Sequence, residues 1–179
     1  MSYKLLRPLL CMALLGLAFG SPAAAPAAAA RANACVKPEY RQFDFWIGDW
    51  KVVDPAGKPQ GTNLVTLIQN RCVLQEHWQG TDGSAGTSFN LYDRTAKRWH
   101  QTWVDNSGGI LLLNGGLVNG VMLMTQPRTL RSGGHVIERI AWTKLTPDKV
   151  RQLWDRSSDG GKTWQVVFDG IYMRKGARQ

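Results

Sequence analysis

From residue 48 onward, apolar and polar residues alternate in short segments that are separated by turn residues. Successive side chains of a β-strand point to opposite faces, so this alternation predicts strands with one buried face. The segments between them contain Gly, Pro, Asp or Asn, the residues that tight turns use. The predicted strands span residues 48–54, 63–69, 72–79, 87–93, 98–105, 109–114, 121–126, 136–144, 149–156 and 163–174.

No segment has a sustained helical period, and the one predicted helical element is a short N-terminal turn over residues 38–45. Short strands joined by tight turns predict an all-β fold, an antiparallel up-and-down arrangement of about nine or ten strands. Closing into a β-barrel removes the exposed edges of such a sheet. We therefore expect a barrel, with a two-sheet sandwich as the alternative.

The first 34 residues differ in composition from the rest. Lys4 and Arg7 precede an apolar run over residues 9–19, and an Ala- and Pro-rich stretch follows. This order is typical of a secretory signal peptide, and the run is shorter than the ~20 residues that span a bilayer. We expect residues 1–34 to be a signal peptide with its cleavage region, cut after Ala30 or Ala34. Residues 35–179 then form a single barrel domain, periplasmic or secreted, without an integral membrane segment.

Export determines how the cysteines are interpreted. Cys11 lies in the predicted signal peptide, which leaves Cys35 and Cys72 as a pair in the mature chain. An even number of cysteines in an oxidising compartment indicates a disulfide. We expect this bond to tie the N-terminal arm to the first strands.

Charge and histidine spacing exclude two classes of partner. The chain carries 22 Lys and Arg against 13 Asp and Glu, a formal net charge of +9. The basic residues are spread without the runs that bind nucleic acid, so no nucleic-acid partner is expected. His77, His100 and His135 lack the spacing of metal ligands, so we expect neither a metal nor a cofactor.

Four predicted strands each carry one acid or amide between large apolar residues on a single face. If these faces point inward, they form apolar walls with a few convergent polar groups, as in small-molecule sites. The alternative is that the polar groups satisfy one another in a packed core. The candidate ligand-binding residues are Glu76, Trp78, Gln101, Trp103, Trp142, Gln152 and Trp154.

The sequence leaves two orientations undecided. Glu138 shares a face with Trp142, but it lies near a strand end and has solvent as an alternative environment. On the strand over residues 87–93, the inward face carries either the apolar Phe89 and Leu91 or the polar Ser88 and Asn90.

The segment SSDGGKTW, residues 157–164, resembles the Asp-box turn of sialidases and related β-propellers. It occurs once, and the chain is too short for the usual four to eight blades of about 40 residues each. We interpret it as a hairpin device. The Asp159 carboxylate accepts backbone N–H groups, Gly160 or Gly161 supplies a positive φ, and Trp164 folds back onto the core.

The segment FDFWIGDW, residues 43–50, followed by EHW, WHQTWVD and the Asp-box turn, resembles an uncharacterised family of exported bacterial proteins. Gly48-x-Trp50 is also similar to the Gly-x-Trp of lipocalins and related calycins, which implies a lipocalin-like barrel with Trp50 closing its base. Haem-binding calycin relatives place a histidine late in the chain, and no histidine follows His135 here. Haem is therefore not expected.

These features together predict an exported lipocalin-like barrel that binds a small, partly apolar molecule in its lumen. One alternative is a hydrolase or isomerase of the same fold, with Glu76 as the acid or base. Another is an envelope interaction module whose interior is solidly packed.

Overall fold

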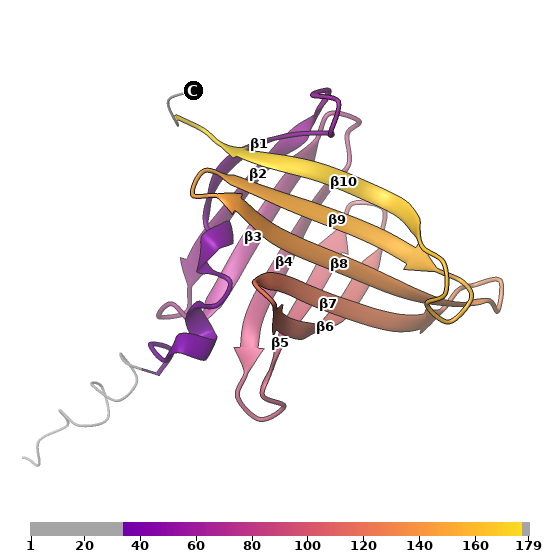
Figure 1. The fold of residues 1–179 in the computed structure, drawn as a ribbon, viewed down its shortest axis with the longest axis horizontal. Helices are drawn as coiled ribbons and strands as arrows, with labels where there is room; N and C mark the ends of the chain where they lie inside the picture. The colour runs from indigo at the N-terminus through magenta and orange to yellow at the C-terminus, as the bar shows by residue number, and fades with distance from the viewer. Residues whose placement is uncertain (1–33, 177–179) are drawn as a thin grey trace, which may run out of the picture.

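The structure is a computed structural model in which residues 34–176 are described. These residues form a closed antiparallel barrel of ten strands in sequence order, and β1 pairs with β10 to complete it (Figure 1). The predicted all-β fold and barrel are confirmed, whereas the predicted signal peptide lies outside the described residues, except for residue 34. The strands are β1 (Gly48–Val53), β2 (Pro59–Ile68), β3 (Val73–Gly80), β4 (Ala85–Asp93), β5 (Arg98–Asp105), β6 (Ile110–Val118), β7 (Val121–Thr129), β8 (His135–Thr146), β9 (Lys149–Ser157) and β10 (Gln165–Arg174).

Strand β6 is longer than the predicted segment over residues 109–114 because Gly115 and Gly116 belong to it. A side chain at Gly115 would collide with the backbone of Leu123 and Met124 on β7. Glycine therefore allows β6 and β7 to approach closely here, and it marks a strand interior rather than a turn.

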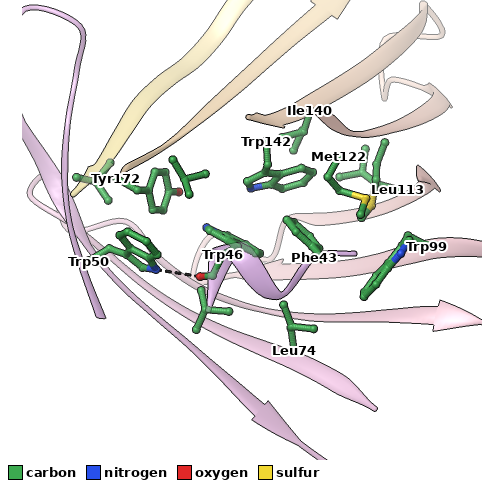
Figure 2. Close-up of a cluster of buried hydrophobic side chains, with 14 of the residues drawn as sticks. Phe43, Trp46, Trp50, Leu74, Trp99, Leu113, Met122, Ile140, Trp142 and Tyr172 are labelled. Atoms are coloured by element: carbon green, nitrogen blue, oxygen red, sulfur yellow. Dashed lines mark hydrogen bonds between the residues drawn. The ribbon is translucent and has the colours of Figure 1, made fainter. Parts of the chain in front are cut away.

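Two short 3₁₀ helices within the described residues, η1 (Pro38–Arg41) and η2 (Asp44–Trp46), lie at one end of the barrel (Figure 1). They place Phe43 and Trp46 inside it, where both side chains are fully buried. The Phe43 ring stacks on Trp46 with centroids 4.9 Å apart and meets the edge of Trp142 at 5.2 Å. Figure 2 shows Phe43 and Trp46 between Trp142 of β8 and Leu74 of β3, which lie on opposite walls. This half of the interior is solidly packed.

Trp50 lies at the packed end, fully buried, and its indole N–H donates to the carbonyl oxygen of Trp46 at 2.9 Å (Figure 2). Gly48 precedes it at a position where a side chain would collide with the guanidinium of Arg174 and the Trp50 ring. Glycine at this position leaves room for the Arg174 guanidinium beside the indole, and a side chain here would require that guanidinium to move.

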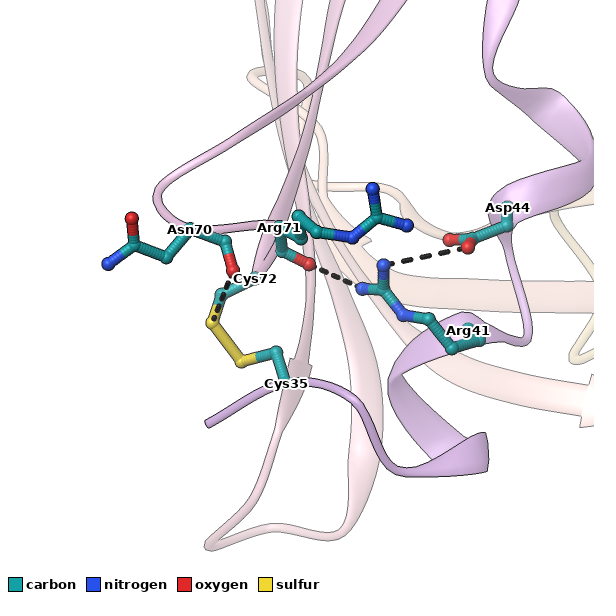
Figure 3. Close-up of a disulfide and its surroundings, with 6 residues drawn as sticks. All are labelled: Cys35, Arg41, Asp44, Asn70, Arg71 and Cys72. Carbon is teal, nitrogen blue, oxygen red and sulfur yellow. Dashed lines mark hydrogen bonds and ion pairs between the residues drawn. A yellow bond between two sulfur atoms is a disulfide. The ribbon is translucent and has the colours of Figure 1, made fainter. Parts of the chain in front are cut away.

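The N-terminal arm that carries the two helices is held by a disulfide between Cys35 and Cys72. This bond joins the arm to the turn between β2 and β3, as the sequence predicted (Figure 3). Arg41 adds a second attachment, since it donates to the carbonyl oxygen of Arg71 and forms an ion pair with Asp44 at 3.5 Å. Among residues 34–176, no helix is long and apolar enough to cross a membrane.

Candidate functional site

The predicted apolar faces of β3, β5, β8 and β9 point into the barrel. Glu76, Gln101 and Glu138 are all buried, whereas Trp78 and Trp103 of their sets are partly buried. On β4, Ser88 and Asn90 face inward and are fully buried, whereas Phe89 is 43% exposed on the outer face. The part of the interior that β4 lines is therefore polar.

A cavity of about 430 Å³ lies between the aromatic cluster at the packed end and the turns at the opposite end. Its inner part has aromatic and aliphatic walls that carry Glu76, Gln101 and Gln152, and polar turn residues line its mouth. Six of the seven candidate ligand residues line it. The inner lining comprises Glu76, Trp78, Gln101, Trp103, Leu111, Ile140, Gln152, Trp154, Phe168 and Tyr172.

Trp142, the seventh candidate, does not line this cavity. Its ring is fully buried in the packed half, where it contacts Phe43 and Trp46. The two side chains delivered by the N-terminal helices occupy the space that Trp142 faces. Its role is therefore in the packed cluster rather than in the cavity wall.

The Glu76 carboxylate is bonded to neutral groups. Asn63 Nδ2 donates to Oε1 at 3.0 Å, and the Ser88 hydroxyl donates to Oε2 at 2.6 Å. Asn90 and Gln101 in turn donate to the Ser88 oxygen at 2.8 and 3.3 Å. Burial raises the pKa of Glu76 to about 7, because desolvation of the charged form outweighs these hydrogen bonds.

A second polar group is centred on Gln152. Its Oε1 accepts the Tyr172 hydroxyl at 2.5 Å and the Trp142 indole N–H at 3.1 Å. Both bonds use the oxygen, so the amide NH₂ is the part of this side chain available to a ligand. Burial, and then the nearby Glu76 charge, raise the pKa of Tyr172 well above its usual value, so its hydroxyl stays protonated as a donor.

Glu138 is outside the cavity lining and does not reach solvent. It is fully buried and forms ion pairs with Arg128 at 3.1 Å and Arg156 at 2.8 Å. It also accepts the Trp154 indole N–H at 2.8 Å, which holds the indole that lines the cavity. Glu138 is thus a positioning group for a cavity wall, and its own partners are two arginines.

The mouth of the cavity carries further charges. Lys58, Asp82 and Asp105 line it together with neighbouring turn residues. Asp105 accepts the Ser107 hydroxyl at 2.6 Å and the Trp103 indole N–H at 3.3 Å. Hydrogen bonds, that from Ser107 foremost, lower the pKa of Asp105, so this carboxylate is ionised at neutral pH.

The Asp-box turn is a hairpin device on the outside of the barrel. Asp159 accepts the backbone N–H groups of Lys162 and Thr163, both at 2.9 Å, and these bonds with the Thr163 and Ser157 hydroxyls hold its pKa well below the usual range. Gly161 has a φ of 92°, as a tight turn requires. Trp164 does not fold onto the core as predicted, and instead it covers the guanidinium of Arg139 at 3.6 Å.

Sequence reasoning missed several residues of the site. Asn63, Phe168 and Tyr172 were not recognised, although Phe168 and Tyr172 lie on one inner face of β10. A β-bulge between Val166 and Phe168 shifts the alternation of that strand. Strict counting of every second residue from the strand start therefore assigns the wrong face. Counting backward from Tyr172 would have identified Phe168.

The described residues contain no group of three His, Cys, Asp or Glu side chains placed to hold a metal ion. No protein-family model matches the chain, and no curated protein matches it.

Proposed function

We propose that this protein is an exported, lipocalin-like barrel that binds a small, partly apolar molecule in the open half of its interior. The observation that carries this proposal is the cavity of about 430 Å³, which has aromatic walls and a few convergent polar groups. Phe43 and Trp46 fill the other half, so the cavity is closed at its base. That arrangement suits retention of a ligand rather than passage through the barrel.

Two observations support the exported, lipocalin-like part of the proposal. The Cys35–Cys72 disulfide is of a kind that persists in oxidising compartments such as the periplasm or the extracellular space. Trp50, two residues after Gly48, is buried at the closed end, which is where the resemblance to lipocalins and related calycins would place it.

A second candidate function is catalysis on the same barrel, as a hydrolase or isomerase. The observation that favours it is the pKa of about 7 at Glu76, which suits a general acid or base at neutral pH. Glu138, another buried carboxylate of the interior, is paired with Arg128 and Arg156. The other carboxylates of the cavity, Asp82 and Asp105, lie at its mouth, so a mechanism would depend on Glu76 at the buried end and binding is the better-supported function.

Native mass spectrometry of the mature protein, purified from the periplasm of an expressing cell without detergent, tests the proposal. We expect an adduct of definite mass that the substitution Trp103→Ala weakens. The matched control is Val104→Ala, because Val104 is the next residue on β5 and lies on the outer face with 46% exposure. An adduct that survives Trp103→Ala unchanged, or a bare polypeptide in every preparation, would argue against a lumen ligand.

The same preparation separates binding from catalysis. The substitution Glu76→Gln keeps the shape of the side chain but removes its charge and its acid–base function. A binder loses affinity for its ligand in this variant. An enzyme retains binding and loses turnover of the identified compound.

A further inference from the structure

Glu76 differs from the other buried carboxylates of the barrel in its partners. Glu138 is bonded to two arginines, and Asp155 forms a bidentate pair with Arg139 at 2.6 and 2.9 Å. Glu76 is equally buried, yet its hydrogen bonds come from the neutral Asn63 and Ser88, and no ion pair involves it among residues 34–176. Because its partners among the described residues are neutral, the ionised form of Glu76 is able to pair with a cation that a ligand supplies.

The charges of the cavity lining agree with this. Glu76, Asp82 and Asp105 oppose the single cation Lys58 among the residues that line the cavity. The whole chain is basic, with a formal net charge of +9, so the cavity is an acidic region in a basic protein. Carboxylates on low-dielectric walls concentrate the field inside a cavity and attract a cationic ligand.

The aromatic walls favour a cation over an anion for a separate reason. The indole N–H groups of Trp78, Trp103 and Trp154 are already bonded, to Ser84, Asp105 and Glu138 respectively. These indoles therefore do not present N–H donors to an anionic or carbonyl ligand. The three indoles line the cavity, and the partly negative π-surfaces of aromatic rings attract ammonium groups within about 6 Å.

We propose that the ligand is an organic cation, an ammonium group on an apolar body, with the ammonium paired to Glu76 and the body enclosed by Trp78, Trp103 and Trp154. This inference rests on the proposed function, since it names the class of molecule that occupies the same cavity. Phe168 adds to the apolar wall of the same cavity.

Three probes of nearly equal shape and different charge test the inference: 3-phenylpropylammonium, 3-phenylpropanol and 3-phenylpropionate. Their dissociation constants are measured by calorimetry at about pH 8.5, where a carboxyl with a pKa of about 7 is ionised. We expect the ammonium to bind at least about tenfold more tightly than the alcohol, and the carboxylate to bind most weakly. The experiment uses the mature protein after removal of any co-purified molecule.

Two variants test whether Glu76 is the group that recognises the ammonium charge. In Glu76→Gln, we expect the affinity for the ammonium to fall to within about threefold of that for the alcohol, while the alcohol itself is unaffected. The control is Asp49→Asn, which removes one negative charge from an exposed pair with Lys175 outside the cavity lining. It should leave the order of the three probes unchanged.

The outcomes separate this inference from the proposed function. If the alcohol or the carboxylate binds as tightly as the ammonium, and Trp103→Ala abolishes that binding, the cavity is a ligand site but the cation inference is wrong. If none of the three probes binds the wild-type protein, the cation inference is likewise overturned. In that case the native mass spectrum still decides independently whether the lumen holds a ligand. The wild-type probe series alone is decisive if Glu76→Gln fails to fold.

Discussion

The guanidinium of Arg174 lies 4.4 Å from the centre of the Trp50 ring, across the seam where β10 meets β1. Its Nη1 donates to the carbonyl oxygen of Ile47 at 3.2 Å, and its Nε pairs with Asp148 at 3.1 Å. The seam pairs only four residues of β1, Trp50 to Val53, with β10. Arg174 therefore links the last strand, the first strand and the packed end of the barrel.

Removal of this link should destabilise the barrel. We expect Arg174→Ala to lower the free energy of unfolding by about 1–3 kcal/mol, because the stacking contact and the bond to Ile47 are both lost. Arg174→Lys should give an intermediate loss, since an ammonium cannot reproduce the planar contact. Urea unfolding followed by fluorescence measures the change. Lys175→Ala is the control, because its ion pair with Asp49 is exposed. Equal effects of the two alanine variants would contradict the prediction.

Phe43 is the centre of the packed half. Its ring is fully buried and lies 5.7 Å from that of Trp99, in addition to its contacts with Trp46 and Trp142. We expect Phe43→Ala to lower the free energy of unfolding by about 3–5 kcal/mol through lost contacts and the cavity that remains. Phe89→Ala, on the outer face, should cost less than about 1 kcal/mol. A Phe43→Ala variant as stable as Phe89→Ala would show that the N-terminal segment is not part of the core.

The raised pKa of Glu76 predicts how the free energy of unfolding depends on pH. Its ordinary pKa of 4.5 is raised to about 7 in the folded barrel, so between these values the native state binds more protons than the unfolded chain. The free energy of unfolding therefore falls as the pH rises through this window, by about 3 kcal/mol for this group.

The difference between the wild-type protein and Glu76→Gln isolates this contribution, because every other titrating group is present in both. Urea unfolding at several pH values from 4 to 8 should show the wild type losing stability relative to the variant as the pH increases. If the two curves run parallel, the carboxyl is not perturbed by burial.

Asp159 should stabilise the hairpin between β9 and β10. Asp159→Ala removes the acceptor for Lys162 N–H and Thr163 N–H and should lower the melting temperature. Its depressed pKa means that the stabilisation is present above the ordinary value of 3.8 and is lost as the pH falls through the folded pKa. Ser158→Ala, at an exposed neighbouring position, is the control. An adduct in the native mass spectrum should be unaffected, since Asp159 does not line the cavity.

The sequence by itself determined the strands, their order and the inward faces of β3, β5, β8 and β9, but it left the face of β4 open. Alternation with a period of two is a local property, and tight turns between neighbouring segments leave antiparallel pairing as the main choice. For this reason Glu76, Gln101 and Gln152 were identified with their aromatic neighbours, and Cys35 with Cys72, before any contact was known.

Only the tertiary structure decided which part of the interior is full and which is hollow. Phe43 and Trp46 come from a segment without strand periodicity, and they occupy the half of the barrel that Trp142 faces. The partners of Glu138 and the bulge that turns Phe168 inward likewise depend on neighbouring strands. The physical reason is that the free space in a barrel depends on the summed volumes of side chains from all its strands and from any inserted segment. Alternation within one strand carries no information about that sum.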